Sequence, residues 1–211
     1  FTTLLEHVKA VGIINMDVLV SGTIFLGKMV EPVSSTKNPY SKMEMGVPYT
    51  HTPKFLQFDY RLVAPAGAPI YSSGFGSKKK LSGRDNAEVF VLLQRRWEDA
   101  KGNIHAERVG TGRERFGKTT MGWVNKHRIP IWYGDIRHHA GYKSFMGLIP
   151  KEKSYYARNS KGKMKPVIEE KWAPVGTKPT HVLVMLSSGC GTAYTGTVGM
   201  TLWVDNVAFV H

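Results

Sequence analysis

One stretch of the sequence matches a nucleotide-binding motif. Residues Gly112 to Thr119 satisfy the P-loop pattern G-x-x-x-x-G-K-[ST]. In a P-loop, backbone amides and the N-terminus of a following helix hold the phosphates, so a buried parallel strand must precede the motif and a helix must follow it. Here charged residues alternate through Ile104 to Val109, and Pro130 follows too soon for a helix of normal length. The context therefore predicts a basic, glycine-rich hairpin loop and no nucleotide site.

The sequence provides equally little support for other kinds of catalytic site. The adjacent His138 and His139 have no further His, Cys or carboxylate at a helical or zinc-finger spacing. The single cysteine, Cys190, lies in a Ser/Gly turn with no identifiable base. A glycosidase needs two carboxylates about 5 to 10 Å apart across a sugar bond, and sequence alone pairs none of the candidates, Asp59, Glu98, Asp99, Glu107 and Asp135. We therefore expect no catalytic residues, no cofactor and no metal.

Aromatic residues in or beside polar loops are the best candidates for binding. Aromatic rings stack on the apolar faces of sugars, while neighbouring polar groups bind hydroxyls or acidic substituents. Trp132 is the strongest single candidate, because it lies opposite Ile129 and Ile131 and points outwards if those two enter the core. The alternative is that most such rings pack in the core. We expect a carbohydrate site among Trp132, Tyr155, Tyr156, Trp172, Trp123 and Tyr142.

The charge of the chain narrows the class of ligand. A formal net charge of +13 attracts polyanions such as nucleic acid, acidic glycans or anionic lipid. No nucleic-acid recognition motif is present, so nucleic acid is not expected as a partner. Residues 137–178 hold eight Lys and two Arg against three Glu, together with four of the six aromatic candidates. We look for a ligand preference in this basic, aromatic segment.

Strands are the elements that must position these residues. In Phe55 to Leu62, apolar and polar residues alternate, which predicts a half-buried antiparallel strand. The run His181 to Leu186 predicts a strand buried on both faces. Further strands are expected over residues 17–26, 88–93, 104–109, 128–133 and 201–210. Thr3 and Glu6 form a capping-box pattern that predicts a short helix, and residues 65–83, with Lys78 to Lys80, read as a solvated loop.

Many short strands between Gly, Pro and Ser turns predict an all-β protein, an antiparallel β-sandwich. A chain of 211 residues is long enough for one such domain, so we expect a single domain over residues 1–211. Residues 1–16 are expected to be a lead-in from the linker of a preceding region. No apolar run approaches the ~20 residues that span a bilayer.

The end of the chain resembles a known family. The segment Ser187 to Val207, with Gly196-Thr197-Val198-Gly199-Met200-Thr201-Leu202-Trp203-Val204-Asp205-Asn206-Val207, is similar to the C-terminal signature of the putative carbohydrate metabolism domain of Bacteroidetes surface lipoproteins. Further similarity occurs in order at residues 46–60, 87–93, 122–123 and 129–131. The resemblance implies a jelly-roll β-sandwich similar to carbohydrate-binding modules, within a larger exported protein, and provides no catalytic residues.

Three functional hypotheses follow from these observations. The first is a non-catalytic carbohydrate-binding module of an exported surface glycan-utilisation protein, with a preference for acidic glycans. The second is a structural or adhesive β-sandwich that presents a neighbouring domain and binds no sugar. The third is a glycoside hydrolase or lyase. The expected partners are a glycan and a neighbouring domain, and the expected location is the cell surface, with lipid anchoring through a segment outside this sequence.

Overall fold

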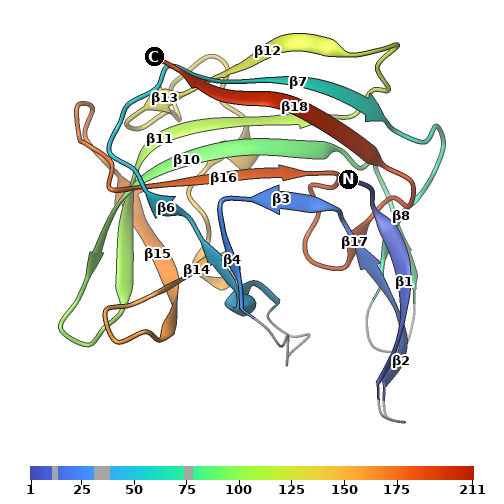
Figure 1. The fold of residues 1–211 in the computed structure, drawn as a ribbon, viewed down its shortest axis with the longest axis horizontal. Helices are drawn as coiled ribbons and strands as arrows, with labels where there is room; N and C mark the ends of the chain where they lie inside the picture. The colour runs from blue at the N-terminus through green and yellow to red at the C-terminus, as the bar shows by residue number, and fades with distance from the viewer. Residues whose placement is uncertain (11–13, 31–38, 74–77) are drawn as a thin grey trace.

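The structure is a computed structural model that describes residues 1–10, 14–30, 39–73 and 78–211. Its strands are β1 (Leu4–Ala10), β2 (Ile14–Val20), β3 (Thr23–Phe25), β4 (Gly27–Met29), β5 (Met43–Met45), β6 (Val47–Pro48), β7 (Phe55–Val63), β8 (Ile70–Ser72), β9 (Lys79–Leu81), β10 (Ala87–Glu98), β11 (Ile104–Phe116), β12 (Val124–Pro130), β13 (Trp132–Tyr133), β14 (Tyr156–Arg158), β15 (Met164–Trp172), β16 (His181–Ser187), β17 (Thr195–Gly196) and β18 (Thr201–Val210). Short 3-10 helices are η1 (Pro39–Lys42), η2 (Ser144–Met146) and η3 (Lys151–Lys153). The prediction of an all-β fold is confirmed (Figure 1).

The molecule is built around one large sheet. Its strand order is β3-β16-β10-β11-β15-β14-β5-β4, with β13 added to β11 and β6 added to β16. A three-stranded sheet, β12-β7-β18, covers one face of the central strands (Figure 1). On the other face, β15, β14, β5 and β4 curl downwards at one end and the β1-β2 hairpin projects at the other, so this face is concave (Figure 1).

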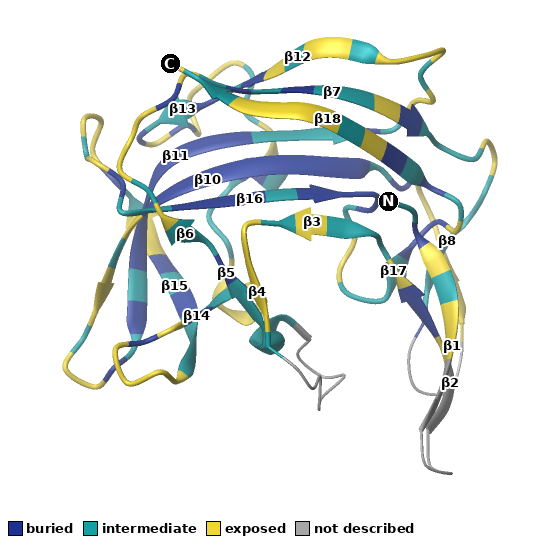
Figure 2. Cartoon of the chain, in the orientation of Figure 1, coloured by how far each residue is buried: buried dark blue, intermediate teal, exposed yellow. Residues whose placement is uncertain are grey.

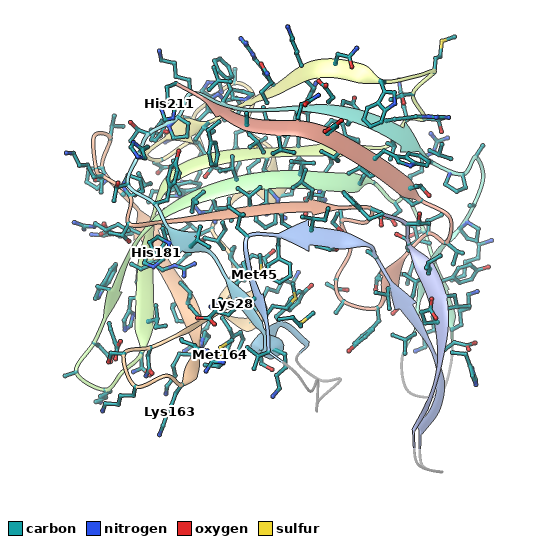
Figure 3. The ribbon with its side chains drawn as sticks, viewed as in Figure 1. Lys28, Met45, Lys163, Met164, His181 and His211 are labelled. Carbon is teal, nitrogen blue, oxygen red and sulfur yellow. The ribbon has the colours of Figure 1, made fainter. Side chains whose placement is uncertain are left out.

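The sandwich core lies between the two sheets. Strand β7 contributes Leu56, Phe58 and Leu62, as its alternating pattern predicts, and β10 contributes Val89 and Val91. All are almost completely buried, and each large apolar side chain removed from water stabilises the fold by about 1.5–3 kcal/mol. Figure 3 shows side chains between the two layers of strands. The core therefore fixes β10 as the centre of the fold.

The opposite face of β10 is also buried. Phe90 and Leu92 alternate with the core valines and pack with Met45 and Leu183 on the concave side. Met45 is labelled below β16 in Figure 3. The first eight residues of β10 are buried in consequence, which Figure 2 shows as a continuous dark strand. The run His181 to Leu186, predicted to be buried on both faces, is buried on its core face at Val182, Val184 and Leu186, whereas on the concave face Leu183 is buried and His181 and Met185 are half-buried.

Most strand predictions are confirmed, and three local predictions are wrong. The segment expected to be a helix near Thr3 is strand β1, because residues 4–10 pair with residues 14–20 in an antiparallel hairpin. The expected loop over residues 65–83 contains β8 and β9, which pair with each other and leave Lys79 and Lys80 exposed. The expected hairpin loop at Gly112 to Thr119 is wrong over residues 112–116, which continue β11 as the partner of β10. Residues 74–77 lie outside the described residues.

The N-terminal residues belong to the β-structure. Residues 1–10 and 14–16, expected as a lead-in, contribute β1 and the start of β2. The amino group of Phe1 donates to the carbonyl of Leu202 at 2.9 Å, and the Leu202 amide donates back to Phe1 at 2.9 Å. Thr3 is buried, with its hydroxyl 2.8 Å from that of Ser188. The two ends of the chain are therefore hydrogen-bonded, while the single-domain boundary stays a prediction.

Candidate functional site

A cavity of about 320 Å³ opens on the concave face of the large sheet. Its floor is formed by Glu88 of β10 and by Arg113 and Arg115 of β11. One wall carries Tyr40, Met43, Lys153 and Tyr155, and the other carries residues 19–21 and the loop 189–195. Ligand pockets in proteins usually enclose about 300–1,000 Å³. The cavity is therefore large enough for a small ligand or for part of a longer one.

The floor is organised by a single buried carboxylate. Glu88, 2% exposed, pairs in register with Arg115 on β11, and Arg113 lies two residues away on the same face. Glu88 Oε1 accepts from Arg115 Nε at 2.6 Å and from Arg113 Nε at 3.1 Å, and Oε2 accepts from Arg113 Nη2 at 2.9 Å. Burial acts to lower the pKa of the Arg113 guanidinium, but Glu88 more than offsets it, so this pKa lies above its usual value. The hydrogen bonds to Glu88 thereby hold both guanidinium groups beside the cavity.

Two tyrosines form the wall beside these charges. The rings of Tyr40 and Tyr155 meet edge to face with centroids 5.8 Å apart, and Tyr155 also packs 5.9 Å from Phe90. Burial raises the pKa of the Tyr155 hydroxyl, with Arg113 acting in the opposite direction. Burial also raises the pKa of Tyr40, against a backbone hydrogen bond with Ala193. Both hydroxyls stay protonated in the neutral range, where they act as hydrogen-bond donors and acceptors.

The opposite wall is anchored by Asp85. Its Oδ1 accepts from the Asn86 amide at 2.8 Å and the Cys190 amide at 3.4 Å, while Oδ2 accepts from the Thr197 amide at 2.8 Å. The Cys190 thiol, which lines the cavity, lies 3.7 Å from Oδ1. Burial raises the pKa of this thiol, so it is a poor nucleophile at neutral pH. Asp85 therefore fixes the loop that closes the cavity.

A second buried ion pair supports the curled end of the sheet. Arg108 and Glu169 are both buried, with Nε to Oε1 at 2.7 Å and Nη2 to Oε2 at 2.5 Å. Oε1 also accepts from Gln94 Nε2 at 2.6 Å, and Oε2 from the Ile149 amide at 2.7 Å. Burial acts to raise the pKa of Glu169, but Arg108 outweighs it and the pKa lies below its usual value. This network joins β11 to β15.

The arrangement suits recognition of an anionic group. Among the described lining residues, three cationic side chains face the cavity, and Glu88 is the one carboxylate. Both oxygens of Glu88 are already occupied by guanidinium groups, so it offers little to a further cation. Guanidinium groups bind carboxylate or sulfate oxygens with charge-assisted hydrogen bonds. No three His, Cys, Asp or Glu side chains of the described ranges are grouped as a metal site needs.

The six aromatic candidates do not form one cluster. Tyr155 lines the cavity. Tyr156 is on β14, and Trp172 ends β15 with its ring 5.6 Å from the guanidinium of Arg108. Ile129 and Ile131 enter the core as expected, but Trp132 is half-buried because His139 stacks on it at 3.8 Å. Tyr142 lies in the same surface turn, and Trp123, 48% exposed, precedes β12.

The residues that sequence reasoning missed lie inside the P-loop-like motif. Arg113 and Arg115 alternate along β11 and therefore share the concave face. Because residues 112–116 lie in a β-strand, this alternation, not the glycine spacing, is the informative signal. Residues 117–123, all described, contain no helix that could bind phosphate as a P-loop does. Glu88 and Tyr40 had no local signal, because their roles depend on which segments lie beside them.

Comparison with known proteins identifies solved structures with a similar fold and the family of the chain. Two solved structures are similar: a putative glycoside hydrolase from Bacteroides thetaiotaomicron, with 18% identity and a TM-score of 0.56, and one from Bacteroides vulgatus, with 15% identity and a TM-score of 0.54. The alignments cover 92% and 91% of this chain but 48% and 65% of the two structures, less than two thirds of either. No curated protein matches. The model of the putative carbohydrate metabolism domain matches residues 2–210, so the chain belongs to that family.

Proposed function

We propose that this domain binds an acidic saccharide in the concave cavity and does not cleave it. The observation that carries the proposal is the floor of the cavity, where Glu88 holds Arg113 and Arg115 side by side next to Tyr40 and Tyr155. The fixed guanidinium groups suit a uronate carboxylate or a sulfate ester. The tyrosine rings and hydroxyls suit the sugar that carries it. Membership of a carbohydrate metabolism family supports the ligand class.

The chemistry of Glu88 favours binding over hydrolysis. A glycosidase uses one carboxylic acid that protonates the leaving group and a second carboxylate about 5 to 10 Å away. Glu88 accepts three hydrogen bonds from guanidinium groups, which occupy both of its oxygens. The nearby Asp85 is likewise committed to backbone amides. We therefore infer a binding role for the cavity, although the names of the similar structures refer to glycoside hydrolases.

The excess of positive charge favours an anionic ligand. Among the residues of the lining that the structure describes, three cations accompany one carboxylate, so an anionic sugar offsets this excess of positive charge. Arg115 donates a hydrogen bond from Nε to Glu88. The centroid of the Phe145 ring lies 4.4 Å from the guanidinium carbon of Arg115, a stacking contact that orients the guanidinium group. Arg115 is the residue we assign to direct contact with the ligand anion.

Isothermal titration calorimetry with alginate, polygalacturonate, hyaluronan and chondroitin sulfate tests the proposal. We expect binding to at least one of them, and no comparable binding to dextran. Arg115→Gln and Tyr155→Phe are each expected to weaken it at least tenfold, since a hydrogen bond to a charged group contributes about 1.5–3 kcal/mol. The titrations are run at 0.15 M and 0.5 M NaCl, because salt screens exposed charges more than buried ones.

The control is Arg137→Gln, which removes the same charge from an exposed arginine outside the cavity. It is expected to leave the affinity within about twofold, as surface ion pairs contribute little. Equal loss of affinity in Arg115→Gln and Arg137→Gln would show that diffuse surface charge attracts the polymer. No binding to any of the four acidic polymers would also refute the proposal.

The cellular setting is part of the same proposal. We infer that the domain acts at the cell surface, beside a neighbouring domain of a longer glycan-utilisation protein. The supporting observation is that the similar Bacteroides structures are longer than the region that aligns with this chain. None of the described residues forms a helix that is long and apolar enough to cross a membrane. Protease accessibility of the domain on intact cells tests the location, and full protection would refute it.

A further inference from the structure

The outer face of the three-stranded sheet carries two exposed tryptophans that the cavity does not use. Strand β7 is central in this sheet, with β12 on one side and β18 on the other. Leu62 and Leu202 point into the core, so their neighbours Arg61 and Trp203 point outwards. Trp203 is 40% exposed, and Arg61 lies over its ring at 5.3 Å. The exposed residues on β18 are visible in Figure 2.

The second tryptophan lies on the other side of β7. Val124 pairs with Tyr60, and Trp123 immediately precedes it, so the backbone of Trp123 enters β12 beside this part of β7. The adjoining segment is fixed against β7, because the Thr120 amide donates to the Leu62 carbonyl at 2.9 Å. Trp123 is 48% exposed. Trp203 on β18, Arg61 on β7 and Trp123 directly before β12 are here named the outer platform.

The spacing of the outer platform sets the size of its ligand. Adjacent strands lie about 4.8 Å apart, so β18 and β12 are about 10 Å apart with β7 between them. One sugar ring stacked on Trp203 does not extend to Trp123 across that distance. A ligand that touches both indoles must therefore be an oligosaccharide or a polysaccharide.

The surroundings of the outer platform distinguish it from a protein interface. The cores of protein interfaces are depleted in charged residues. Here polar and charged groups continue from the tryptophans along the same face. Asp59 accepts from Asn206 Nδ2 at 2.7 Å and from the Lys126 amide at 2.5 Å, and Arg128 Nε donates to Gln57 at 2.8 Å. Exposed rings beside hydrogen-bonding side chains match the alternation of apolar faces and hydroxyl groups in a sugar chain.

The charge of this face differs from that of the cavity. Arg61, Lys126 and Arg128 are accompanied by Asp59 and Asp205, which oppose each other across β7 and β18, whereas the described lining of the cavity has one carboxylate for its three cations. The smaller excess of positive charge gives a polyanion less advantage here than in the cavity. We propose that the outer platform is a second carbohydrate-binding site, separate from the cavity, that takes a neutral polysaccharide chain.

Affinity gel electrophoresis with hydroxyethyl cellulose, galactomannan and soluble starch tests the proposal. We expect at least one gel to retard the wild-type protein. Trp203→Ala and Trp123→Ala are each expected to weaken the binding about tenfold, which corresponds to a stacking contribution within the range of aromatic contacts. Oligosaccharides of the retarding polymer should compete, and its monosaccharide should not.

Trp97→Ala is the matched control. Trp97 is 42% exposed, close to the value of the two platform residues, but it stacks on His105 at the end of β10. It is expected to keep wild-type retardation. Because Trp203 and Trp123 are 40% and 48% exposed, their substitution also removes buried apolar surface, and urea denaturation checks that each variant is folded under the conditions of the electrophoresis.

Three results would overturn this inference. The first is the absence of retardation in every neutral gel. The second is equal loss of retardation in Trp97→Ala and in the platform variants. The third is a wild-type dimer in solution that Trp203→Ala converts to a monomer without retardation by glycan, which would identify the face as an interface between two copies of the chain.

Discussion

Glu88 and Arg115 face each other across β10 and β11, with Oε1 of Glu88 2.6 Å from Nε of Arg115. The same carboxylate holds Arg113, so a single acidic group keeps two guanidinium groups together in the floor of the cavity. Removal of one partner of a buried ion pair leaves the other charge uncompensated and destabilises a protein by about 3–5 kcal/mol.

Glu88→Gln is therefore expected to lower the free energy of unfolding by about 3 kcal/mol or more. The substitution keeps the size of the side chain but removes the charge. Urea denaturation gives the measurement. Glu114→Gln is the control, because Glu114 lies in the next strand with a side chain that is 40% exposed, and a loss below about 1 kcal/mol is expected there. Similar losses in both variants would contradict the assigned role of Glu88.

Replacement of both Arg108 and Glu169 should cost less stability than replacement of Glu169 alone. Glu169→Gln alone leaves the fully buried Arg108 without its counter-charge, and a loss of about 3–5 kcal/mol is expected. The double change Arg108→Met with Glu169→Leu removes both charges, and most of the stability should return. A double-mutant cycle from urea denaturation measures the coupling energy. A double variant less stable than Glu169→Gln would contradict this expectation.

Asp85→Asn should loosen the loop that forms one wall of the cavity. The amide nitrogen of Asn cannot accept a hydrogen bond, so either Thr197 or the amides of Asn86 and Cys190 lose an acceptor, at a cost of about 1–3 kcal/mol. Because Cys190 is the single cysteine, its rate of reaction with a thiol reagent reports on the opening of this loop. We expect faster labelling in the variant. An unchanged rate would mean that other contacts hold the loop.

The stability of the fold should fall in mild acid through His181. Burial, followed by the charge of Arg96, lowers the pKa of His181 to about 4, compared with about 6.5 in the unfolded chain. The neutral ring is favoured in the fold, so its contribution is complete above pH ~6.5 and is lost as the pH falls towards 4. His181→Asn should therefore flatten the pH dependence of the melting temperature in this range. An identical slope in the variant would disprove the assignment.

In contrast to His181, His105 should stabilise the fold more at low pH than at high pH. A hydrogen bond with Glu170, against some loss of solvation and with support from Asp99, raises the pKa of His105 in the fold. A group with a raised pKa contributes stability at pH values below its unfolded value and loses that contribution as the pH rises through its folded value. His105→Gln should therefore destabilise the protein more at pH 5 than at pH 8, as measured by thermal melting. A larger effect at pH 8 would contradict this.

Local patterns identified the strands with a clear alternation or a dense apolar run, but not every strand and not the site. The alternation of Leu56, Phe58 and Leu62 with polar residues identified β7, because burial on one face has a period of two. The floor of the cavity depends on the register that brings Glu88 opposite Arg115, 27 residues later. Tyr40 and Tyr155 meet over a still larger separation. No local pattern encodes such pairings, so of the predicted aromatics Tyr155 lies in the cavity and the others are dispersed.

The capping-box prediction was wrong for a related reason. Residues Thr3 to Glu6 have the local chemistry of a helix start, but antiparallel pairing of residues 4–10 with residues 14–20 satisfies the same backbone groups. Intrinsic preferences of a few residues are small compared with a complete hairpin ladder.

Strand β10 belongs to two surfaces at once, since Val89 and Val91 fill the sandwich core while Glu88 lines the cavity and Phe90 packs on that same side of the strand. A change in the cavity floor must therefore preserve the packing on the reverse side of the same strand. The rim has more freedom, because residues 189–195 and the segment around Lys153 lie outside the long strands. Members of this family that differ in ligand selectivity should accordingly diverge at the rim and retain similar floors, so specificity can evolve without a new fold.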